Sequence, residues 1–222
     1  MPTALVIGAS RGIGKEFAHQ LLQDGWKVYA TARDDTALAT LHTAGAETFK
    51  LDVARPESLA TISWQLDGVK LDLAVYVAGV LGSRNDATEP PTVADFDAVM
   101  HTNVLGAMQA IPMVAPFVEA AAGQFMFVSS GMGSISDASS SYTWVYRASK
   151  AALNMVVKSA ASTYSKATML VMSPGWVRTD MGGPHAGISV EQSVSDMRRV
   201  LSTLGVKDSG SFYNHDGRQL PW

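Results

Sequence analysis

Short apolar runs alternate with amphipathic stretches along the whole chain. Thr3–Ile7 and Gln124–Val128 are short and almost wholly apolar, which is typical of strands buried on both faces. Longer stretches with a helical period lie between such runs; Gly12–Asp24, for example, places Ile13 and Phe17 on one face. Strands are predicted at 3–7, 27–32, 47–51, 71–78, 124–128, 168–172 and 211–213, and helices at 12–24, 35–42, 56–66, 92–100, 103–121, 142–165 and 189–204.

This βαβ order predicts a parallel sheet with helices on both faces, and therefore a single doubly wound α/β domain over residues 1–222. No repeat, linker or long charge run divides the chain. Pro112 and Pro116 should kink the helix that contains them. Ligands of such sheets bind beyond the carboxyl ends of the strands. Chemistry is therefore expected just after Ile7, Ala32, Leu51, Ala78, Val128 and Met172.

Composition narrows the class of protein. The 17 Lys and Arg against 20 Asp and Glu give a net charge of −3, which disfavours nucleic-acid binding. The absence of cysteine excludes disulfides, zinc-thiolate sites and thiol nucleophiles, and we expect no metal. The first residues lack a signal-peptide pattern, and the longest apolar stretch, Leu73–Leu81, is too short to span a bilayer. We therefore expect a cytoplasmic protein without a membrane partner.

Three glycines, Gly8, Gly12 and Gly14, lie in the turn GASRGIG after the first predicted strand. Small residues let the backbone approach a pyrophosphate, and a helix N-terminus supplies N–H donors and partial positive charge. The spacing differs from the general G-x-G-x-x-G fingerprint, and a tight turn without a ligand is the alternative. The position of the glycine turn, between the first predicted strand and the first predicted helix, favours binding of a dinucleotide.

The second predicted strand indicates which dinucleotide. An acidic residue about 20 positions after the glycine turn is typical of NAD binding, whereas an Arg there accommodates the 2′-phosphate of NADP. Arg33 occupies this position, and Arg11 supplies a second guanidinium. Asp34 and Asp35 follow as expected caps of the next helix. We expect NADP(H) to be preferred over NAD(H); the alternative is that both arginines are solvated surface residues.

Tyr146 and Lys150 are four residues apart at the start of a predicted helix, and therefore share one face. An unperturbed Tyr has a pKa near ~10, and a nearby ammonium lowers it toward useful acid–base chemistry. Such a pair also occurs by chance on many helices, so it carries weight only in combination with other motifs.

The combination is present. GASRGIG, HTNVLGA with Asn103, VSSGMGS with Ser129 and Ser130, YRASK, and PGWVRTDMGG occur in this order over nearly the whole chain. Together they resemble the short-chain dehydrogenase/reductase family, and most of all its C-factor-like and carbonyl-reductase branch. The resemblance implies a Rossmann domain of about seven strands in the order 3-2-1-4-5-6-7. It also implies an NADP(H)-dependent oxidoreductase that moves a hydride between nicotinamide and a carbonyl or alcohol substrate.

The resemblance also implies roles for individual residues. Tyr146 corresponds to the catalytic acid/base, and Lys150 to the residue that binds the nicotinamide ribose and lowers the Tyr pKa. Ser130 corresponds to the group that binds the substrate oxygen, and Asn103 to the holder of a water that relays protons from Lys150. Cofactor contacts are implied for Gly8, Ser10, Arg11, Gly12, Ile13, Gly14, Arg33, Asp52, Val53, Ala78, Gly79, Tyr146, Lys150, Pro174, Gly175, Val177 and Thr179.

Structural roles are the alternatives for three of these residues. Asp52 could cap the helix ahead of Pro56, and Thr179 could cap a short turn. Asn103 could satisfy backbone groups where one helix breaks into another.

The chain departs from the family pattern in two places. Tyr76-Val77-Ala78-Gly79 replaces the common Asn-Asn-Ala-Gly, which removes an Asn that ties neighbouring strands together. Ser130 lies 16 residues before Tyr146, which is longer than the common spacing, and Ser134 lies 12 before it. Ser130 is preferred as the catalytic serine because it follows the strand directly, with the extra residues in the loop Ser139–Ser141.

The sequence constrains the substrate and the oligomeric state less than it constrains the fold. Met132, Trp144, Trp176 and Met181 could form an apolar pocket, or could be ordinary packing residues. Asp180–Asp208 is expected to form a substrate lid, because adjacent glycines permit a mobile loop. No cluster of cations in the sequence marks an acidic substrate, so an apolar aldehyde or ketone is expected. Members of this family are usually dimers or tetramers, which pair through the helices predicted here at 103–121 and 142–165.

Two other functions remain open. A non-catalytic dinucleotide sensor or signalling protein could use the same fold, although it would not need the proton donor Tyr146. An epimerase or dehydratase could use the Tyr–Lys pair, although the short C-terminal region leaves little room for a nucleotide-sugar domain.

Overall fold

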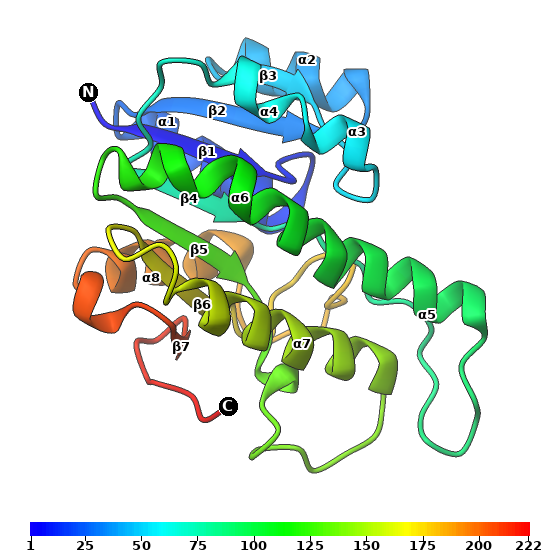
Figure 1. Cartoon of the computed structure of the whole chain (residues 1–222). Coiled ribbons are helices and arrows are strands. Elements are labelled where there is room, and N and C mark those ends of the chain that lie inside the picture. Colours follow the sequence, from blue (N-terminus) through cyan, green and yellow to red (C-terminus); the bar gives the residue numbers. More distant parts are fainter.

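A computed structural model describes all residues, 1–222, and contains one seven-stranded parallel sheet (Figure 1). The strand order is β3-β2-β1-β4-β5-β6-β7, so the expected doubly wound topology is confirmed. The strands are β1 (Thr3–Ile7), β2 (Lys27–Ala32), β3 (Glu47–Lys50), β4 (Leu73–Tyr76), β5 (Gln124–Val128), β6 (Thr168–Ser173) and β7 (Ser211–Asn214).

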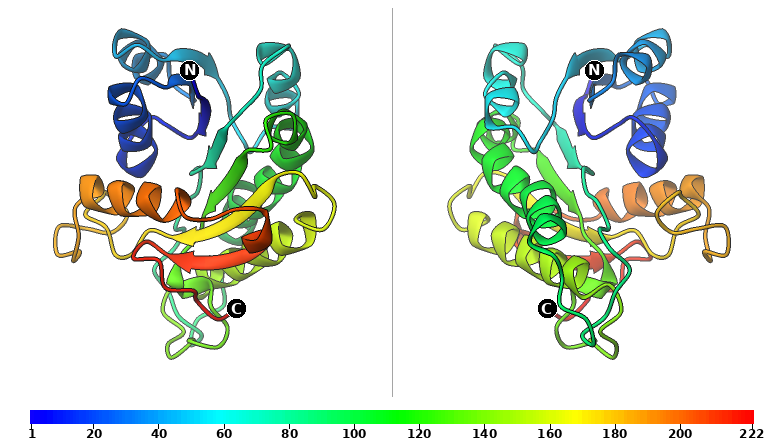
Figure 2. Two further views of the ribbon diagram at one scale, coloured as in Figure 1. Left: turned by 90° about the vertical axis from the view of Figure 1, so that its left-hand side faces the viewer. Right: turned by 90° about the vertical axis from the view of Figure 1, so that its right-hand side faces the viewer.

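Helices cover both faces of the sheet, as Figure 2 shows edge-on. The α-helices are α1 (Gly12–Gln23), α2 (Asp35–Thr43), α3 (Pro56–Leu59), α4 (Ile62–Gln65), α5 (Val93–Met100), α6 (Gly106–Glu119), α7 (Trp144–Ala160) and α8 (Val190–Leu201). Three shorter elements are the π-helix η1 (His101–Leu105) and the 3₁₀ turns η2 (Gly131–Gly133) and η3 (Val206–Asp208). No helix is both long and apolar enough to cross a membrane.

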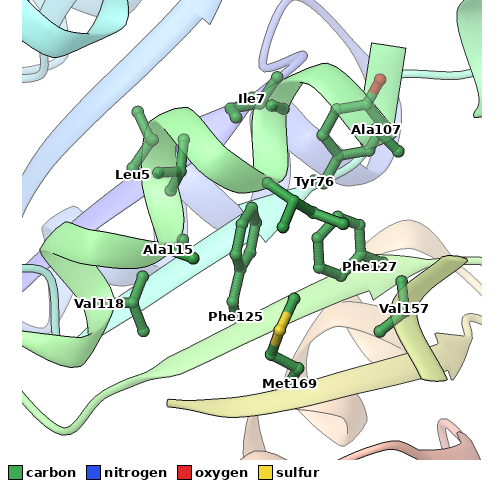
Figure 3. Packing of buried hydrophobic residues seen from close by; sticks show 14 of the residues in the cluster. Leu5, Ile7, Tyr76, Ala107, Ala115, Val118, Phe125, Phe127, Val157 and Met169 are labelled. Atoms are coloured by element: carbon green, nitrogen blue, oxygen red, sulfur yellow. The ribbon is translucent and has the colours of Figure 1, made fainter. Parts of the chain in front are cut away.

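Two separate apolar layers hold the helices to the sheet. Alternate residues of a strand face opposite sides, so Leu5 and Ile7 join one layer while Ala4 and Val6 join the other. The first layer packs α3, α4, α6 and α7 against the sheet, and the second packs α1, α2 and α8. Figure 3 shows the centre of the first layer, where Phe125 and Phe127 pack with their ring centroids 4.3 Å apart. Both strand faces are buried, which explains the continuously apolar strand sequences.

The two helices predicted at 92–100 and 103–121 are joined in the structure by an irregular helical turn. α5 continues through the π-helix η1 into α6, and α6 runs uninterrupted through Pro112 and Pro116. Both prolines are exposed, so the carbonyl groups that lose an N–H partner lie on the solvent side of the helix. The π-helix inserts a wider turn at Asn103, a feature that often occurs at functional sites.

Other boundaries differ modestly from the prediction. Residues 56–66 form two short helices, α3 and α4, instead of one. α7 begins at Trp144 because Thr143 adopts a left-handed conformation with φ of 55°. The segment between β5 and α7 contains the 3₁₀ turn η2, for which no helical element was predicted.

The expected lid, Asp180–Asp208, divides into two parts. α8 buries Val194, Met197 and Leu201 in the layer that also contains α1, so this helix belongs to the core. Residues 180–189 lie outside helix and strand, and the role of this segment as a lid stays a prediction.

Candidate active site

The glycine turn forms a closely packed cradle at the carboxyl end of β1. Gly8 has a φ of +91°, and a Cβ there would lie 2.9 Å from the backbone N of Ala78. A Cβ on Gly14 would lie 2.1 Å from the carbonyl oxygen of Gly8. Arg11, the N-cap of α1, makes no capping bond with its side chain, so the N–H groups of the first turn are not occupied by a cap. Close backbone packing and unoccupied N–H groups thus lie where the sequence predicts a pyrophosphate.

The other residues of the turn lie around the same cradle. Ser10 is exposed and Ile13 is half-buried. Gly12 has a φ of +51°, and a Cβ there would lie 3.4 Å from Cγ2 of Thr179. The glycine turn and the segment after β6 therefore meet at this point.

The two arginines assigned to a 2′-phosphate lie in different surroundings. Arg33 is exposed directly after β2 and makes no ion pair or side-chain hydrogen bond in the structure. Arg11 pairs instead with Asp180 at 2.9 Å, with both side chains largely exposed. The neighbouring acids are engaged elsewhere, since Asp34 caps α2 by accepting from the N–H of Ala37 at 2.8 Å, and Asp35 pairs with Lys50. Arg33 is therefore free to meet an anion.

The residues after β3 and β4 flank the cradle. Asp52 accepts from the backbone N–H of Ala54 at 3.1 Å, so it shapes the turn after β3 and does not cap α3, whose N-cap is Arg55. Val53 is buried, with its carbonyl group packed against Gly106.

Tyr76 replaces the missing family Asn in a different way. Its fully buried hydroxyl donates to the carbonyl oxygen of Thr102 at 3.2 Å, and this bond ties β4 to the π-helix. Burial raises the pKa of the Tyr76 phenol, which therefore stays neutral. The backbone N–H groups of Val77 and Ala78 both donate to Ile7 O, at 2.9 and 3.2 Å, which ties this segment to β1.

Lys150 is the most unusual side chain of the site, because its ammonium group is buried. Its Nζ donates to the carbonyl oxygen of Val128, the last residue of β5, at 3.0 Å. A Cβ on Gly79 would lie 3.5 Å from Nζ, and one on Gly133 would lie 2.9 Å from the Lys150 carbonyl carbon. Burial lowers the pKa of Lys150 to about 8. Glycine at 133 thus makes room for the lysine, whereas a Cβ at Gly79 would meet Asn103 Oδ1 more closely, at 3.2 Å.

Tyr146 lies one turn before Lys150 on α7 and is also buried, with the lysine Nζ 5.6 Å from its ring centroid. Burial raises the pKa of the Tyr146 phenol to about 12, and the Ser130 hydroxyl acts in the opposite direction. The net direction is therefore opposite to the lowering that the sequence led us to expect from Lys150. Desolvation outweighs the nearby groups, and the phenol is held in its protonated form at neutral pH.

Asn103 is fully buried in the π-helix and bridges two other segments. Its Nδ2 donates to Val80 O and to Ser149 Oγ, both at 2.9 Å, while its Oδ1 accepts from Val80 N at 2.8 Å. Ser149 in turn donates to the carbonyl oxygen of Tyr146 at 2.7 Å. Asn103 thus satisfies backbone groups, the structural role left open above, and it also joins the loop after β4 to the Tyr146 turn.

The two candidate serines have different surroundings. The Ser130 hydroxyl caps η2 by accepting from Met132 N at 3.1 Å, and it interacts with the Tyr146 phenol. Ser134 is also buried, but its hydroxyl bonds to different groups: it accepts from Asp137 N at 3.2 Å and donates to Trp222 O at 3.5 Å. The geometry therefore brings Ser130, and not Ser134, to Tyr146.

Sequence reasoning missed two supporting residues, Ser149 and Asn154. Asn154 accepts from Ser129 Oγ at 2.6 Å and donates to Gly133 O at 3.2 Å, which fixes the strand end and the turn that carry Ser130. A signal was available, because Tyr146, Lys150 and Asn154 recur every four residues on one face of α7. A buried polar residue in register with the Tyr146–Lys150 pair indicates a supporting contact.

The segment after β6 contains the residues expected to hold the nicotinamide. The carbonyl oxygen of Pro174 accepts from Ser193 Oγ on α8 at 2.6 Å. Gly175 has a φ of +80°, and a Cβ there would lie 2.8 Å from the ring of His215. Val177 is buried, and Thr179 Oγ1 accepts from Gly182 N at 3.0 Å, so Thr179 does stabilise a short turn.

The residues expected to line a substrate pocket come from loops at the same edge of the sheet. Met132 and Trp144 are half-buried after β5 and at the start of α7. Trp176 is exposed, with its indole N–H donating to Gly182 O at 2.9 Å, and Met181 is also exposed. No group of three or more metal-ligating side chains occurs in the structure.

The buried lysine makes stability depend on pH. The folded-state pKa of Lys150, about 8, lies below its ordinary value of 10.5. Between these values the unfolded chain binds a proton that the folded protein has released, so the free energy of unfolding should rise with pH. In urea denaturation, the free energy of unfolding of the wild type minus that of Lys150→Met should therefore increase by roughly 1–3 kcal/mol from pH 7 to pH 10.

Lys15→Met, at an exposed lysine of α1, is the matched control and should show a constant difference from the wild type. A Lys150→Met difference that stays flat or falls with rising pH would contradict burial of the ammonium.

Comparisons with known proteins agree with this geometry. The family model for short chain dehydrogenase matches residues 2–186. A Rhodococcus sp. (strain AD45) protein named 1-hydroxy-2-glutathionyl-2-methyl-3-butene dehydrogenase is 33% identical, with 100% of both chains covered. The C-signal protein of Myxococcus xanthus is 35% identical over 68% of this chain and 93% of its own.

A solved structure supports the same placement. The NADPH-bound carbonyl reductase from chicken fatty liver superposes with a TM-score of 0.90 at 31% identity, and the match covers 100% of this chain and 99% of the reductase. The resemblance stated from the sequence motifs is thereby confirmed. The chain belongs to the short-chain dehydrogenase/reductase family of oxidoreductases, in its carbonyl-reductase branch.

Proposed function

We propose that the protein is an NADP(H)-dependent reductase of aldehydes or ketones, with Tyr146 as the general acid. The observation that carries this proposal is the convergence of Ser130, Tyr146, Lys150 and Asn103 beside the glycine cradle. The NADPH-bound neighbour and the Rhodococcus relative, named as a dehydrogenase of a hydroxy compound, support the same class of reaction.

The cofactor, when bound, supplies the hydride for the carbonyl carbon, and the protein supplies position and protons. The Ser130 hydroxyl donates to the substrate oxygen and polarises the carbonyl group. Tyr146, protonated in its buried environment, gives its phenolic proton to the same oxygen. In the reverse direction the phenol oxygen accepts that proton.

Lys150 acts on the charge that forms at Tyr146 after proton transfer. With a pKa of about 8 the ammonium is mostly protonated at neutral pH, and its position near the ring lets it stabilise a phenolate. Lys150 is also proposed to bind the hydroxyls of the nicotinamide ribose. Asn103, which lies beside Gly79 and the lysine Nζ, is proposed to hold the water that returns the proton from solvent.

The proposed preference for NADP(H) over NAD(H) rests on Arg33, the unpaired arginine that follows β2. Arg33 presents an unpaired guanidinium at the end of the strand that follows the glycine turn, and the nearby acids are already bonded. We propose that Arg33 binds the 2′-phosphate of NADP(H), with Arg11 joining when its exposed pair with Asp180 opens.

A non-catalytic sensor or signalling protein is the second candidate, and the similarity to the C-signal protein favours it. The buried Tyr146–Lys150 pair argues against it, because a dinucleotide can be bound without a desolvated proton donor.

Assembly and location are part of the proposal. Phe96, Leu105, Met108 and Met155 are exposed on α5, η1, α6 and α7, and such apolar side chains support pairing of these helices in a homodimer or homotetramer. A cytoplasmic location is proposed from the requirement for NADPH.

Substitution of the reacting groups tests the reaction. Tyr146→Phe should lower kcat for NADPH-dependent aldehyde reduction by about 10²–10⁴-fold, because the proton donor is lost. Ser130→Ala should lower it by about 10²–10³-fold through loss of the oxyanion donor. Oxidation of NADPH at 340 nm measures both, and NADPH fluorescence shows whether each variant still binds the cofactor.

Ser134→Ala is the matched control and should retain nearly full activity, since its hydroxyl points to Asp137 and Trp222. Equal losses in the two serine variants would overturn the assignment of Ser130. Full activity of Tyr146→Phe would overturn the proposed mechanism. NADPH binding without turnover of any tested carbonyl would favour the sensor.

Cofactor preference has its own test. Arg33→Asp should lower affinity for NADPH and raise that for NADH, and so change the ratio of the two Kd values by at least about tenfold. Fluorescence titration measures both Kd values, with the exposed Arg218→Asp as a charge-matched control. An unchanged ratio in Arg33→Asp would contradict binding of the 2′-phosphate by Arg33.

A further inference from the structure

An arginine that the proposed reaction does not use lies where three loops meet. Arg84 belongs to the loop between β4 and α5. Its Nη2 donates to the carbonyl oxygen of Met181 at 3.1 Å, and its Nη1 donates to the hydroxyl of Tyr142 at 3.4 Å. Met181 follows β6, and Tyr142 lies between β5 and α7. The loops that leave the carboxyl ends of β4, β5 and β6 therefore converge on one guanidinium.

The same three loops carry the reacting groups. Arg84 lies five residues after Gly79, which packs beside the Nζ of Lys150. Tyr142 precedes Tyr146 by four residues, and the loops from β4 and β5 are also joined where Thr143 N donates to Asn85 O at 2.8 Å. Arg84 thus belongs to a loop that lies beside Lys150 through Gly79 and beside the start of α7 through Asn85. In Figure 1 both loops project from the same side of the molecule, beyond the strand arrowheads.

Neither Arg84 nor its neighbour Arg147 has an acidic partner. Arg147 donates through Nε to the carbonyl oxygen of Tyr142 at 2.9 Å, so two guanidinium groups gather around one tyrosine. None of the ion pairs in the structure includes either arginine. Arg84 is exposed, and its partners, a phenol and a carbonyl oxygen, are both neutral.

No carboxylate of these loops forms an ion pair with Arg84 or Arg147. Asp95 accepts from Ser83 N at 3.0 Å, Asp86 accepts from Thr88 N at 2.9 Å, and Asp180 pairs with Arg11. The two guanidinium groups therefore keep N–H donors available for an anion from outside the chain. A guanidinium presents a planar fork that matches a carboxylate, and the bonds to a charged acceptor are stronger than those to neutral ones.

We propose that Arg84 determines substrate specificity by binding the acidic end of the substrate. The substrate class is an aldehyde or ketone that carries a carboxylate remote from the carbonyl group reduced at Tyr146. This inference rests on the proposed function, and it replaces the purely apolar substrate expected from the sequence. Arg84 and Arg147 are 63 residues apart in the chain, so only the fold reveals that they share a site.

Matched substrates test the proposal. The probes are 4-carboxybenzaldehyde and the longer 4-(carboxymethoxy)benzaldehyde, each compared with its methyl ester. The wild type should prefer each acid to its ester. Arg84→Gln should lower kcat/KM for the acids by about tenfold, mainly through KM, and should leave the esters nearly unchanged. For the acids, kcat/KM of Arg84→Lys should lie between the values of the wild type and Arg84→Gln, because an ammonium keeps the charge but lacks the planar pair of donors.

Arg218→Gln, at a remote exposed arginine, is the control and should behave as the wild type. A wild type that does not prefer the acids, or an equal loss of kcat/KM for acids and esters in Arg84→Gln, would overturn the proposal.

A binding measurement separates this inference from the proposed function. Isothermal titration of the NADP⁺-loaded protein with benzoate and with benzamide requires no turnover. Benzoate should bind more tightly than benzamide to the wild type and lose that advantage in Arg84→Gln. If no aldehyde is reduced but this pattern holds, the reductase proposal fails and the anion site stands. If aldehydes are reduced but benzoate has no advantage, the anion site is overturned and the reductase stands.

Discussion

The structure depends on burying one ammonium group at the carboxyl edge of the sheet. A buried cation needs an acceptor and space, and the chain provides both. The last carbonyl group of β5 accepts from Lys150, and Gly133 leaves room where a side chain would crowd the lysine. The cost of this burial is visible in the lowered pKa of Lys150. Such a cost is typical of a site selected for chemistry rather than for stability.

The neighbouring features are arranged around this lysine. The π-helix turns Asn103 inward so that it bonds Val80 and Ser149, and the 3₁₀ turn after β5 holds Ser130 beside Tyr146. Tyr76 anchors the π-helix through the carbonyl oxygen of Thr102. Each of these contacts joins segments distant in sequence, and together they fix the reacting side chains before any ligand binds.

The fold was largely predictable from the sequence, because its strands are continuously apolar and its helices are amphipathic. The glycine turn was equally clear, since its conformation and packing require glycine at Gly8 and Gly14. The motif resemblance also identified the family.

Several features could not be predicted from the sequence because they depend on contacts between segments that are distant in the chain. The π-helix at Asn103 has no local signature, and the net rise in the Tyr146 pKa depends on burial that only the folded chain defines. The convergence of Arg84 and Arg147 depends on how loops from three strands meet. The sequence also did not show that α8, within the segment expected to form a lid, packs its apolar face into the core.

Tracing the hydrogen that reaches the product tests the central claim most directly. The protein would be incubated with an aldehyde and with NADPH carrying deuterium at either of the two positions on C4 of the nicotinamide. Mass spectrometry of the alcohol should show one deuterium on the carbinol carbon with one labelled cofactor and none with the other, because the site holds substrate and cofactor in a single orientation. An alcohol that lacks deuterium with both cofactors would contradict direct hydride transfer at this site.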